Sequence, residues 1–308
     1  MDPVEKHAPG VTGIVVTHSD IKNFLLCRRR WYWDYVQDFR KPESPVGPLA
    51  LGTRVHEALE HYYRGRGDAL ERFEELARRD IEAVDRDDTP PWVVDQLYKD
   101  IVVGRNCVKG HQQWLEDTGA DENFDIVGAE LTVTAPLLEG RVQIQGKVDV
   151  LFRRRDNGFL VVNDLKTDGG RPGTREQLER SWQHHIYLIA LRLMEPEAIV
   201  GEAYYTVIRK LSRPSSATRP MVERWRVPGT TRMAAGKQRQ LEAICAEMLR
   251  TMEQIETEGL AHAFPSPNHE CQWCPYKQPC EVVDESVEAA RAMLDREFVR
   301  GGRHDRYT

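Results

Sequence analysis

The chain has 308 residues, of which 40% are hydrophobic and 30% charged, and its formal net charge is −6 at pH 7. A chain of this length can form one large domain or two modest ones. No apolar run approaches the roughly 18 residues that a membrane span needs, and the polar N-terminus MDPVEKHAPG shows no signal peptide. We therefore expect a cytoplasmic protein with no membrane partner, whose six cysteines are thiols or metal ligands rather than disulfides.

The negative total charge excludes a uniformly basic nucleic-acid binder, but the positive charge is unevenly distributed. Local basic clusters occur at Arg28–Arg30 and Arg153–Arg155, and in the series Arg171, Arg175 and Arg180. A nucleic acid requires a local positive track rather than a positive total, so the clusters are compatible with DNA binding. Solvated surface arginines are the alternative interpretation.

The sequence predicts helices in the first third of the chain and strands after it. Hydrophobic periodicity and capping signals predict helices over residues 20–36 (capped by Ser19), 51–63, 69–84 and 92–116. Strands are expected over residues 124–134, 142–152, 159–165, 201–208 and 221–227. Further helices are expected over residues 175–194 and 231–258.

These elements predict an α/β (α+β) protein with a mixed central sheet flanked by helices. Residues 1–120 form a helical N-terminal part carrying Cys27 and His56, and residues 121–230 form the core. Residues 231–308 contribute C-terminal helices and a cysteine cluster. We expect the three segments to make one integrated unit.

The most informative stretch is a predicted hairpin. Asp156-Asn157-Gly158 is a strong turn signal between the runs Val142–Phe152 and Phe159–Leu165. Asp164 and Lys166 are two apart on the second run, so their side chains project from the same face.

The partner of Lys166 on the first strand depends on the turn. If Asn157-Gly158 is a two-residue turn, Asp149 sits opposite Lys166, with Asp164 diagonally adjacent. A bulged three-residue turn would change this pairing. In the two-residue case two carboxylates and an ammonium converge: the acids can hold a hard divalent cation, and the lysine can orient or deprotonate a water. This combination suits phosphodiester cleavage.

Two helical segments offer further candidates. His56, in LGTRVHEALEHYY, is a possible third ligand for the cation, although a lone helical histidine is more often structural. A zinc-protease motif is excluded because His56 and His61 are five residues apart and lie on different helical faces. Gln183 and Tyr187 are four apart and share a helical face; they either reach the site or belong to an ordinary amphipathic helix.

The cysteines form a second signal. Cys271, Cys274 and Cys280 have the spacing C-x2-C-x5-C, and Cys27 is the best candidate for a fourth thiolate. Cys107 and Cys245 lie in helical segments and are interpreted as packing residues. The spacing suits a four-cysteine zinc site or a [4Fe–4S] cluster, and unliganded thiols are a third possibility.

In their order and separation, these motifs resemble the PD-(D/E)xK nuclease superfamily, in its RecB-like branch. That family orders a helical histidine, G-x-x-D, D/E-x-K and Q-x-x-x-Y, and here His56, Gly146–Asp149, Asp164–Lys166 and Gln183–Tyr187 follow it. One early cysteine and three late ones further resemble the iron–sulfur members, including the AddB nuclease domain and exonucleases of CRISPR adaptation, which phages also carry. The resemblance covers about residues 20–285.

The resemblance implies a restriction-endonuclease-like fold and a role for each motif residue. His56, Asp149, Asp164 and the main-chain carbonyl of Leu165 would bind Mg²⁺ or Mn²⁺. Lys166 would activate the attacking water, while Gln183 and Tyr187 would support the site. Glu130, on the preceding strand, is a minor candidate for the acidic site. The four cysteines Cys27, Cys271, Cys274 and Cys280 would hold a [4Fe–4S] cluster in preference to zinc.

The implied function is a metal-dependent DNA exonuclease acting on single strands or DNA ends, with Arg28, Arg29, Arg30, Arg171 and Arg175 as possible DNA contacts. Recombination, repair or adaptation proteins are possible partners. An iron–sulfur DNA-binding or assembly factor with little nuclease activity is the alternative, and a redox sensor is a third. The complete acid–acid–lysine set disfavours both rivals.

Overall fold

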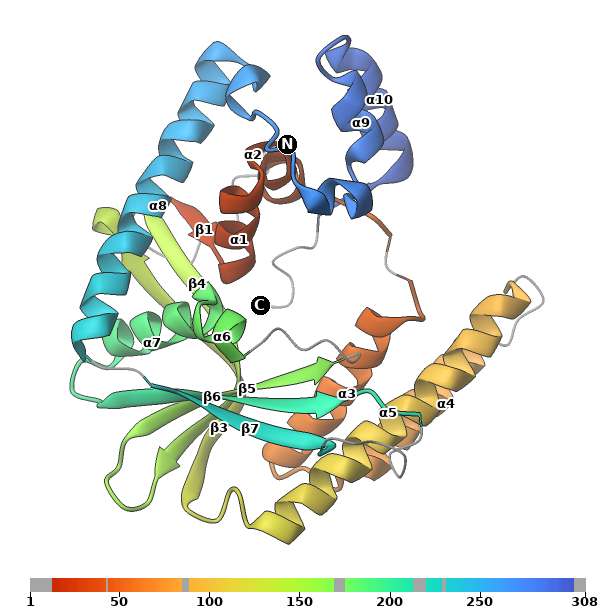
Figure 1. The fold of residues 1–308 in the computed structure, drawn as a ribbon, viewed down its shortest axis with the longest axis vertical. Helices are drawn as coiled ribbons and strands as arrows, with labels where there is room; N and C mark the ends of the chain where they lie inside the picture. Colours follow the sequence, from red (N-terminus) through yellow and green to blue (C-terminus); the bar gives the residue numbers. More distant parts are fainter. Residues whose placement is uncertain are drawn as a thin grey trace. The chain divides into compact units, whose positions relative to one another are not determined.

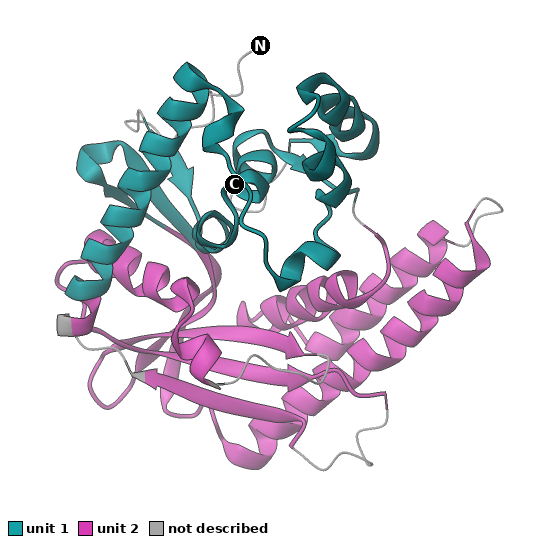
Figure 2. Cartoon of the chain, turned by 45° about the horizontal axis from the view of Figure 1, so that its top comes forward, with its two compact units in different colours: residues 1–43, 134–146, 235–308 teal, residues 44–133, 147–234 magenta. Residues whose placement is uncertain are grey.

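The computed structural model describes residues 13–42, 44–84, 89–168, 175–212, 220–228 and 231–301. The chain forms two compact units, each assembled from separated stretches (Figure 2). Unit 1 comprises residues 1–43, 134–146 and 235–308, and unit 2 comprises residues 44–133 and 147–234. Cys27 and His56, which the sequence places in one segment, thus belong to different units. The expected α/β architecture with a mixed sheet and flanking helices is confirmed.

Unit 2 is built on a mixed sheet. Strand β4 (Val142–Arg154) pairs antiparallel with β5 (Leu160–Asp168), which runs parallel to β6 (Val200–Arg209). β6 pairs antiparallel with β7 (Val222–Pro228), and β3 (Phe124–Leu137) pairs with β4. The parallel step requires a crossover, and the segment containing α6 (Arg175–Glu179) and α7 (Trp182–Met194) supplies it.

The hairpin between β4 and β5 forms with a different register from the one a two-residue turn gives. Val150 pairs with Asn163 and Arg153 with Leu160. Extending this register by one residue places Asp149 opposite Asp164, whereas the two-residue turn would place it opposite Lys166. The reason is the turn: Gly158 N–H donates to Arg154 O and Arg154 N–H to Phe159 O, closing a longer loop. A shift of two residues preserves the face on which each side chain lies.

Three long helices cover one face of this sheet: α3 (Pro48–Tyr63), α4 (Ala69–Val84) and α5 (Pro91–Thr118) (Figure 1). α3 and α5 each begin with proline, whose missing N–H costs nothing in the first turn. Gly119, with φ of 59°, ends α5 in the left-handed conformation that glycine adopts easily. The buried core between helices and sheet includes Leu59, Phe73, Leu97, Val150, Phe152 and Leu165.

In unit 1, the single helix expected over residues 20–36 is broken at Cys27. Cys27 has extended backbone, φ −165° and ψ 113°, and separates α1 (His18–Leu26) from α2 (Arg28–Trp31), which continues into η1 (Tyr32–Val36). Thr17, not Ser19, caps α1, through a reciprocal capping box with Asp20.

The remainder of unit 1 combines short strands with the C-terminal helices. β1 (Ile14–Val16) runs parallel to the first residues of β4, and β2 (Phe39–Arg40) pairs with β8 (Val299–Arg300). The helical elements are α8 (Thr231–Glu258), η4 (Leu260–His262), η5 (His269–Trp273), α9 (Lys277–Val282) and α10 (Val287–Glu297). η2 (Leu138–Gly140) links β3 to β4. Among the described residues, no helix has the length and apolar character that crossing a membrane requires.

Candidate active site

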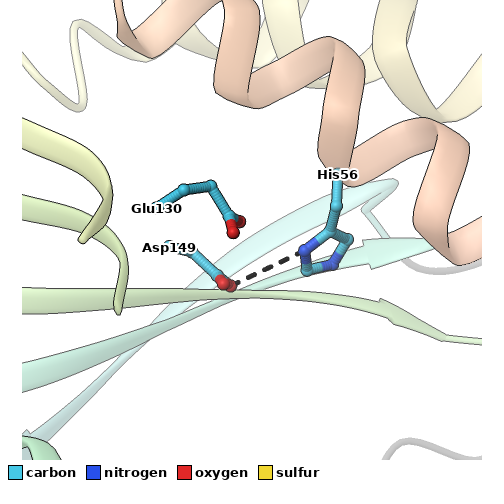
Figure 3. Close-up of side chains that lie close together, drawn as sticks. All are labelled: His56, Glu130 and Asp149. Atoms are coloured by element: carbon cyan, nitrogen blue, oxygen red, sulfur yellow. Dashed lines mark ion pairs between the residues drawn. The ribbon is translucent and has the colours of Figure 1, made fainter. Parts of the chain in front are cut away.

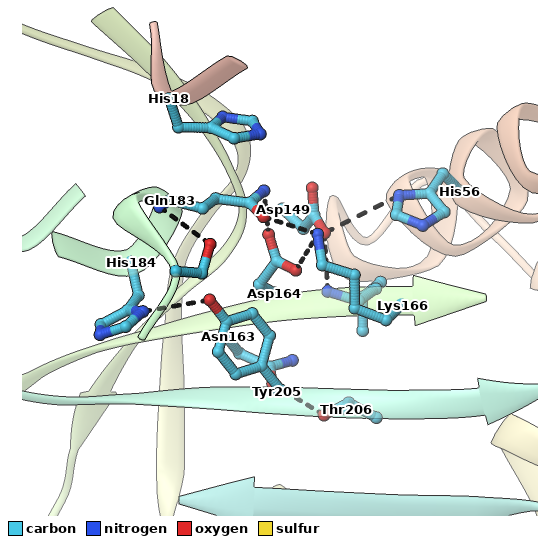
Figure 4. Close-up of polar contacts among 12 residues, drawn as sticks. His18, His56, Asp149, Asn163, Asp164, Lys166, Gln183, His184, Tyr205 and Thr206 are labelled. Atoms are coloured by element: carbon cyan, nitrogen blue, oxygen red, sulfur yellow. Dashed lines mark hydrogen bonds and ion pairs between the residues drawn. The ribbon is translucent and has the colours of Figure 1, made fainter. Parts of the chain in front are cut away.

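The structure brings the six side chains of the nuclease-like motifs together within unit 2. Asp149 lies on β4, and Asp164 and Lys166 lie on β5 (Figure 4). His56, Gln183 and Tyr187 lie on helices. α7 carries Gln183 and Tyr187 over the face of β5 that Asp164 and Lys166 share, opposite the packed core. His56 belongs to α3.

Asp164, Lys166 and Gln183 form a closed polar network. Lys166 Nζ lies 2.6 Å from Asp164 Oδ2 and donates to Gln183 Oε1 at 2.8 Å. Gln183 Nε2 donates to Asp164 Oδ1 at 2.7 Å and also lies 2.9 Å from the hydroxyl of Tyr187. Asp164 is only 1% exposed, so its charge is offset by these contacts rather than by water. The network fixes the lysine amine at the edge of the carboxylates.

Asp149 is held by the neighbouring strand. Its Oδ2 accepts the main-chain N–H of Leu165 at 2.6 Å. Burial raises the pKa of Asp149 well above its usual value, the charge of Asp164 raises it further, and Lys166 opposes both. Two acids this close favour a cation between or beside them, because each disfavours ionisation of the other. The expectation that the Leu165 carbonyl binds metal stays a prediction.

His56 and Asp149 meet a third group, Glu130. One ligand atom from each of the three lies within 4.8 Å of the others (Figure 3). His56 Nδ1 is 3.8 Å from Asp149 Oδ2. Burial, followed by the charge of Lys166, lowers the pKa of His56, which favours the neutral imidazole that ligates metals. Asp164 is outside this group, and its oxygens face Lys166 and Gln183.

Glu130, a minor candidate in the sequence, lies in the group with His56 and Asp149. It has φ of +52°, in the left-handed region, so simple alternation along β3 does not reveal which way its side chain points. Its carboxylate lies 2.8 Å from Lys147 Nζ. Its position seven residues before the end of β3, at Leu137, carries no distinctive sequence signal.

A second polar network supports the sheet behind the site. Asn163, next to Asp164 in sequence, is fully buried and accepts a hydrogen bond from Thr206 Oγ1 at 2.7 Å. Arg224 Nε donates to the same Thr206 oxygen at 2.9 Å, and its Nη1 lies 2.7 Å from Asp121 Oδ1. Because side chains alternate along a strand, Asn163 fixes β5 to β6 without entering the site.

The four motif cysteines all belong to unit 1 and are free thiols. Cys27 lies between α1 and α2, Cys271 lies in η5, Cys274 ends η5, and Cys280 lies in α9. Burial raises the pKa of the Cys274 thiol, and the charges of Cys27 and Cys280 add to the rise. Cys274 and Cys280 both pack against one hydrophobic cluster of unit 1.

The sulfur spacing bears on which metal the four cysteines could hold. Zinc–sulfur bonds of about 2.3 Å would bring the sulfurs to about 3.8 Å of each other. Across the described parts of the chain, no three cysteine sulfurs lie within 4.8 Å of one another. A [4Fe–4S] core places iron and sulfide between its ligands and so suits wider spacing. Four thiols in one unit are, by their chemistry, the donor set that either zinc or a [4Fe–4S] cluster takes.

The three arginines after Cys27 are engaged inside unit 1. Arg28 Nη2 is 2.7 Å from Glu247, Arg29 Nη2 is 2.9 Å from Asp284, and Arg30 Nη1 is 3.2 Å from Glu270. Their role as DNA contacts stays a prediction. Arg171 lies outside the described residues, and Arg175 is the first residue of α6.

Comparison with known proteins places this geometry in a family. Residues 15–281 match the model of a family described as the PD-(D/E)XK nuclease superfamily. No curated protein sequence matches.

Two solved structures are similar at low identity. One, named "Putative exonuclease", comes from Eubacterium rectale; it is 10% identical, with 88% of this chain and 92% of that chain covered and a TM-score of 0.48. The other, SSO0001, is 13% identical, with 87% and 86% covered and a TM-score of 0.36.

Proposed function

The chain belongs to the PD-(D/E)XK nuclease superfamily, and from this premise we propose that it is a metal-dependent DNA exonuclease acting on single strands or DNA ends. The observation that carries the proposal is the joint arrangement of two groups in unit 2. A lysine is fixed by Asp164 and Gln183, and beside it lies a histidine–carboxylate group able to hold a cation.

His56, Glu130 and Asp149, with Asp164 beside them, would hold Mg²⁺ or Mn²⁺. Carboxylate oxygens suit both ions, and an imidazole nitrogen favours Mn²⁺. A bound ion supplies Lewis acidity, which lowers the pKa of water and neutralises charge on a phosphoryl oxygen. The raised pKa of Asp149 fits this assignment, because the buried acids lack sufficient positive charge among the protein groups alone.

Lys166 would position and deprotonate the attacking water, or donate to a phosphate oxygen as negative charge develops. Its side chain is one-third exposed, and its amine contacts Asp164 and Gln183. Gln183 would act through Lys166 and Asp164 by holding both at hydrogen-bond distance. Tyr187 would in turn orient Gln183.

Substrate DNA would be bound through its backbone by basic residues, among them Arg171 and Arg175, with no reading of base sequence. Arg28–Arg30 would each have to exchange an ion pair for a phosphate. Of these, the exposed pairs cost least to exchange. Recombination, repair or adaptation proteins would be the associated partners.

Cys27, Cys271, Cys274 and Cys280 would hold a [4Fe–4S] cluster of structural role, with zinc as the rival. Support comes from the order of the cysteines in the sequence and from the packing of Cys274 and Cys280 against one hydrophobic cluster of unit 1. A group that joins residue 27 to residue 280 closes a very long loop, where the entropic stabilisation is largest in principle.

The test uses protein purified without oxygen. End-labelled single- and double-stranded DNA is incubated with Mn²⁺ or Mg²⁺, with and without EDTA, and iron and zinc are assayed in the same preparation. We expect nucleotide release from ends with either ion and none with EDTA, together with bound iron. A preparation that binds DNA but never cleaves it would point to the assembly-factor alternative. A colourless preparation with bound zinc would remove the cluster and leave the nuclease.

A further inference from the structure

Arg29 is the most buried of the three arginines that follow Cys27, and its contacts differ in kind from those of its neighbours. Its side chain is 5% exposed, against 24% for Arg28 and 25% for Arg30. Arg28 pairs with Glu247 and Arg30 with Glu270, whereas Arg29 also contacts main-chain carbonyls and a cysteine sulfur. A deeply buried guanidinium must find several acceptors to offset its desolvation.

The acceptors of Arg29 all come from the C-terminal part of unit 1. Nε donates to the Ala263 carbonyl at 3.2 Å, and Nη2 donates to Asp284 Oδ1 at 2.9 Å. Nη1 donates to the Cys280 carbonyl at 3.4 Å and lies 3.6 Å from Cys280 Sγ, within range for the larger sulfur atom. One side chain thereby joins the segment beginning at Cys27 to the segment containing Cys280.

This placement gives Arg29 a charge role as well as a geometric one. Asp284, its ionic partner, has a side chain that is 71% exposed, so water screens much of that attraction. The positive charge of the buried Arg29 guanidinium would be offset better by four metal-bound thiolates than by Asp284 alone. Hydrogen bonds to cluster sulfurs and local net charge are two of the factors that set the potential and stability of iron–sulfur sites.

We propose that Arg29 is a positioning residue for the cysteine site. It directs a guanidinium N–H at the sulfur of Cys280, holds that sulfur relative to Cys27, and stabilises the negative charge that accumulates on a reduced cluster. The inference rests on the proposed iron–sulfur function of the four cysteines. It assigns to the Arg-Arg-Arg run a role that the DNA-binding interpretation does not contain.

The experiment compares Arg29→Gln with Arg28→Gln in the full chain, purified without oxygen. Arg28→Gln is a matched control because it removes the same charge from the neighbouring residue. The Arg28 side chain contacts Glu247 and Thr251 and, among the described residues, no cysteine. Three quantities are measured: iron and sulfide content, the rate of iron transfer to a chelator, and the midpoint potential followed by visible absorbance.

We expect Arg29→Gln to release iron about tenfold faster, the lower end of the effect of losing an outer hydrogen bond. Its midpoint potential should move to a more negative value, because a donor and a positive charge have left the sulfur. Arg28→Gln should match the wild type in both. Asp284→Asn should move the potential the opposite way, since the charge of Arg29 is then less neutralised.

The outcomes separate this inference from the cluster proposal. Iron-loaded wild type with an Arg29→Gln variant of unchanged release rate and potential overturns the role of Arg29 and leaves the cluster in place. Wild type that binds no iron overturns both. Should Arg29→Gln fail to fold, Arg29→Lys and Asp284→Asn carry the test, and unchanged potentials in both overturn the inference.

Discussion

The carboxylate site of unit 2 and the cysteine site of unit 1 are built in opposite ways. The first takes its side chains from long regular elements, such as β5 and α7, and these side chains contact one another directly. The second uses short elements: α2 has four residues, η5 five and α9 six. Regular backbone fixes side-chain direction by itself, whereas short segments need cross-links such as Arg29.

The contrast teaches that the two sites should fail differently. A change in the carboxylate site removes chemistry and leaves the surrounding sheet and helices intact. A change among the cysteines would remove the proposed metal cross-link and loosen the segments that it joins. Four predictions test this distinction and a fifth concerns the stability of unit 2; they run from the largest expected effect to the smallest.

Asp164→Asn and Lys166→Met should each lower DNA cleavage by about 10³-fold or more. Each removes a charge that acts directly on the reacting groups, and such losses reach this size at other active sites. Lys109→Met, which removes an exposed amine from α5, is the matched control and should keep full activity. Cleavage rates and far-UV circular dichroism are compared. Activity above a tenth of wild type in both variants would refute the assignment.

Cys280→Ser should eliminate bound iron and make the segment from η4 to α10 sensitive to limited proteolysis, while the helices of unit 2 stay protected. The control in the same unit is Cys245→Ala. Cys245 is fully buried, and burial raises the pKa of its thiol to about 12, so it is expected to be an inert packing residue. Equal iron content in the two variants would contradict the cysteine assignment.

Gln183→Ala should lower kcat by about 10- to 100-fold with little change in KM. The reason is that Gln183 does not react itself but holds Lys166 and Asp164 in place. Tyr187→Phe should cost less, since Gln183 keeps its two other contacts. Steady-state kinetics distinguish the cases. A rise in KM alone would indicate that Gln183 binds DNA instead.

Glu130→Gln should raise the Mn²⁺ concentration needed for half-maximal activity about tenfold, as expected for a weakened metal site. Saturating metal should recover most of the rate. The measurement is a Mn²⁺ titration of cleavage, with Glu122→Gln as the surface control. An unchanged titration would leave Glu130 as the structural partner of Lys147 alone.

The smallest effect concerns stability. Burial lowers the pKa of His111 to about 3, and the charge of Arg224 contributes. The folded protein keeps His111 neutral at pH values where the unfolded chain, with a histidine pKa of about 6.5, takes up a proton. Stability should therefore fall as pH drops below that value, by about 1.4 kcal/mol for each pH unit until the folded pKa is reached.

His111→Gln removes this contribution while keeping a side chain that can hydrogen-bond to the Tyr63 hydroxyl, 3.2 Å away in the wild type. Urea unfolding of both proteins between pH 7 and pH 5 measures the difference. If the free energies of unfolding of the two proteins change in parallel with pH, His111 takes up its proton as readily in the folded state as in the unfolded state.

Much of the carboxylate site could be predicted because its residues lie at short spacings on regular elements. Asp164 and Lys166 share a face by strand alternation, and Gln183 and Tyr187 share one by helical spacing. The register of β4 and β5 was harder to predict from the sequence, because it is set by hydrogen bonds in the loop and not by the Asn-Gly turn signal. A shift of two residues still left Asp149 on the predicted face.

Other features depend on contacts that local patterns cannot contain. Glu130 itself has a left-handed backbone conformation, which breaks the alternation of side chains along β3 and places its carboxylate near His56 and Asp149. The basic run after Cys27 looked like solvated or DNA-facing charge, yet the acids that bind it are Glu247, Glu270 and Asp284, far away in sequence. Tertiary ion pairs of this kind become visible only when the chain is folded.

The division of the chain sets an order of events during synthesis. Every segment of unit 2 lies between the first and last segments of unit 1, so its site residues have left the ribosome before Cys271 is made. At about 5–20 residues per second, Cys27 waits on the order of 10–50 s for Cys280. Unit 2 can therefore take shape first, and loading of the proposed cluster would be the closing step of maturation. If that proposal holds, a cell short of iron would accumulate chains in which the carboxylate site is formed and the two ends are not joined.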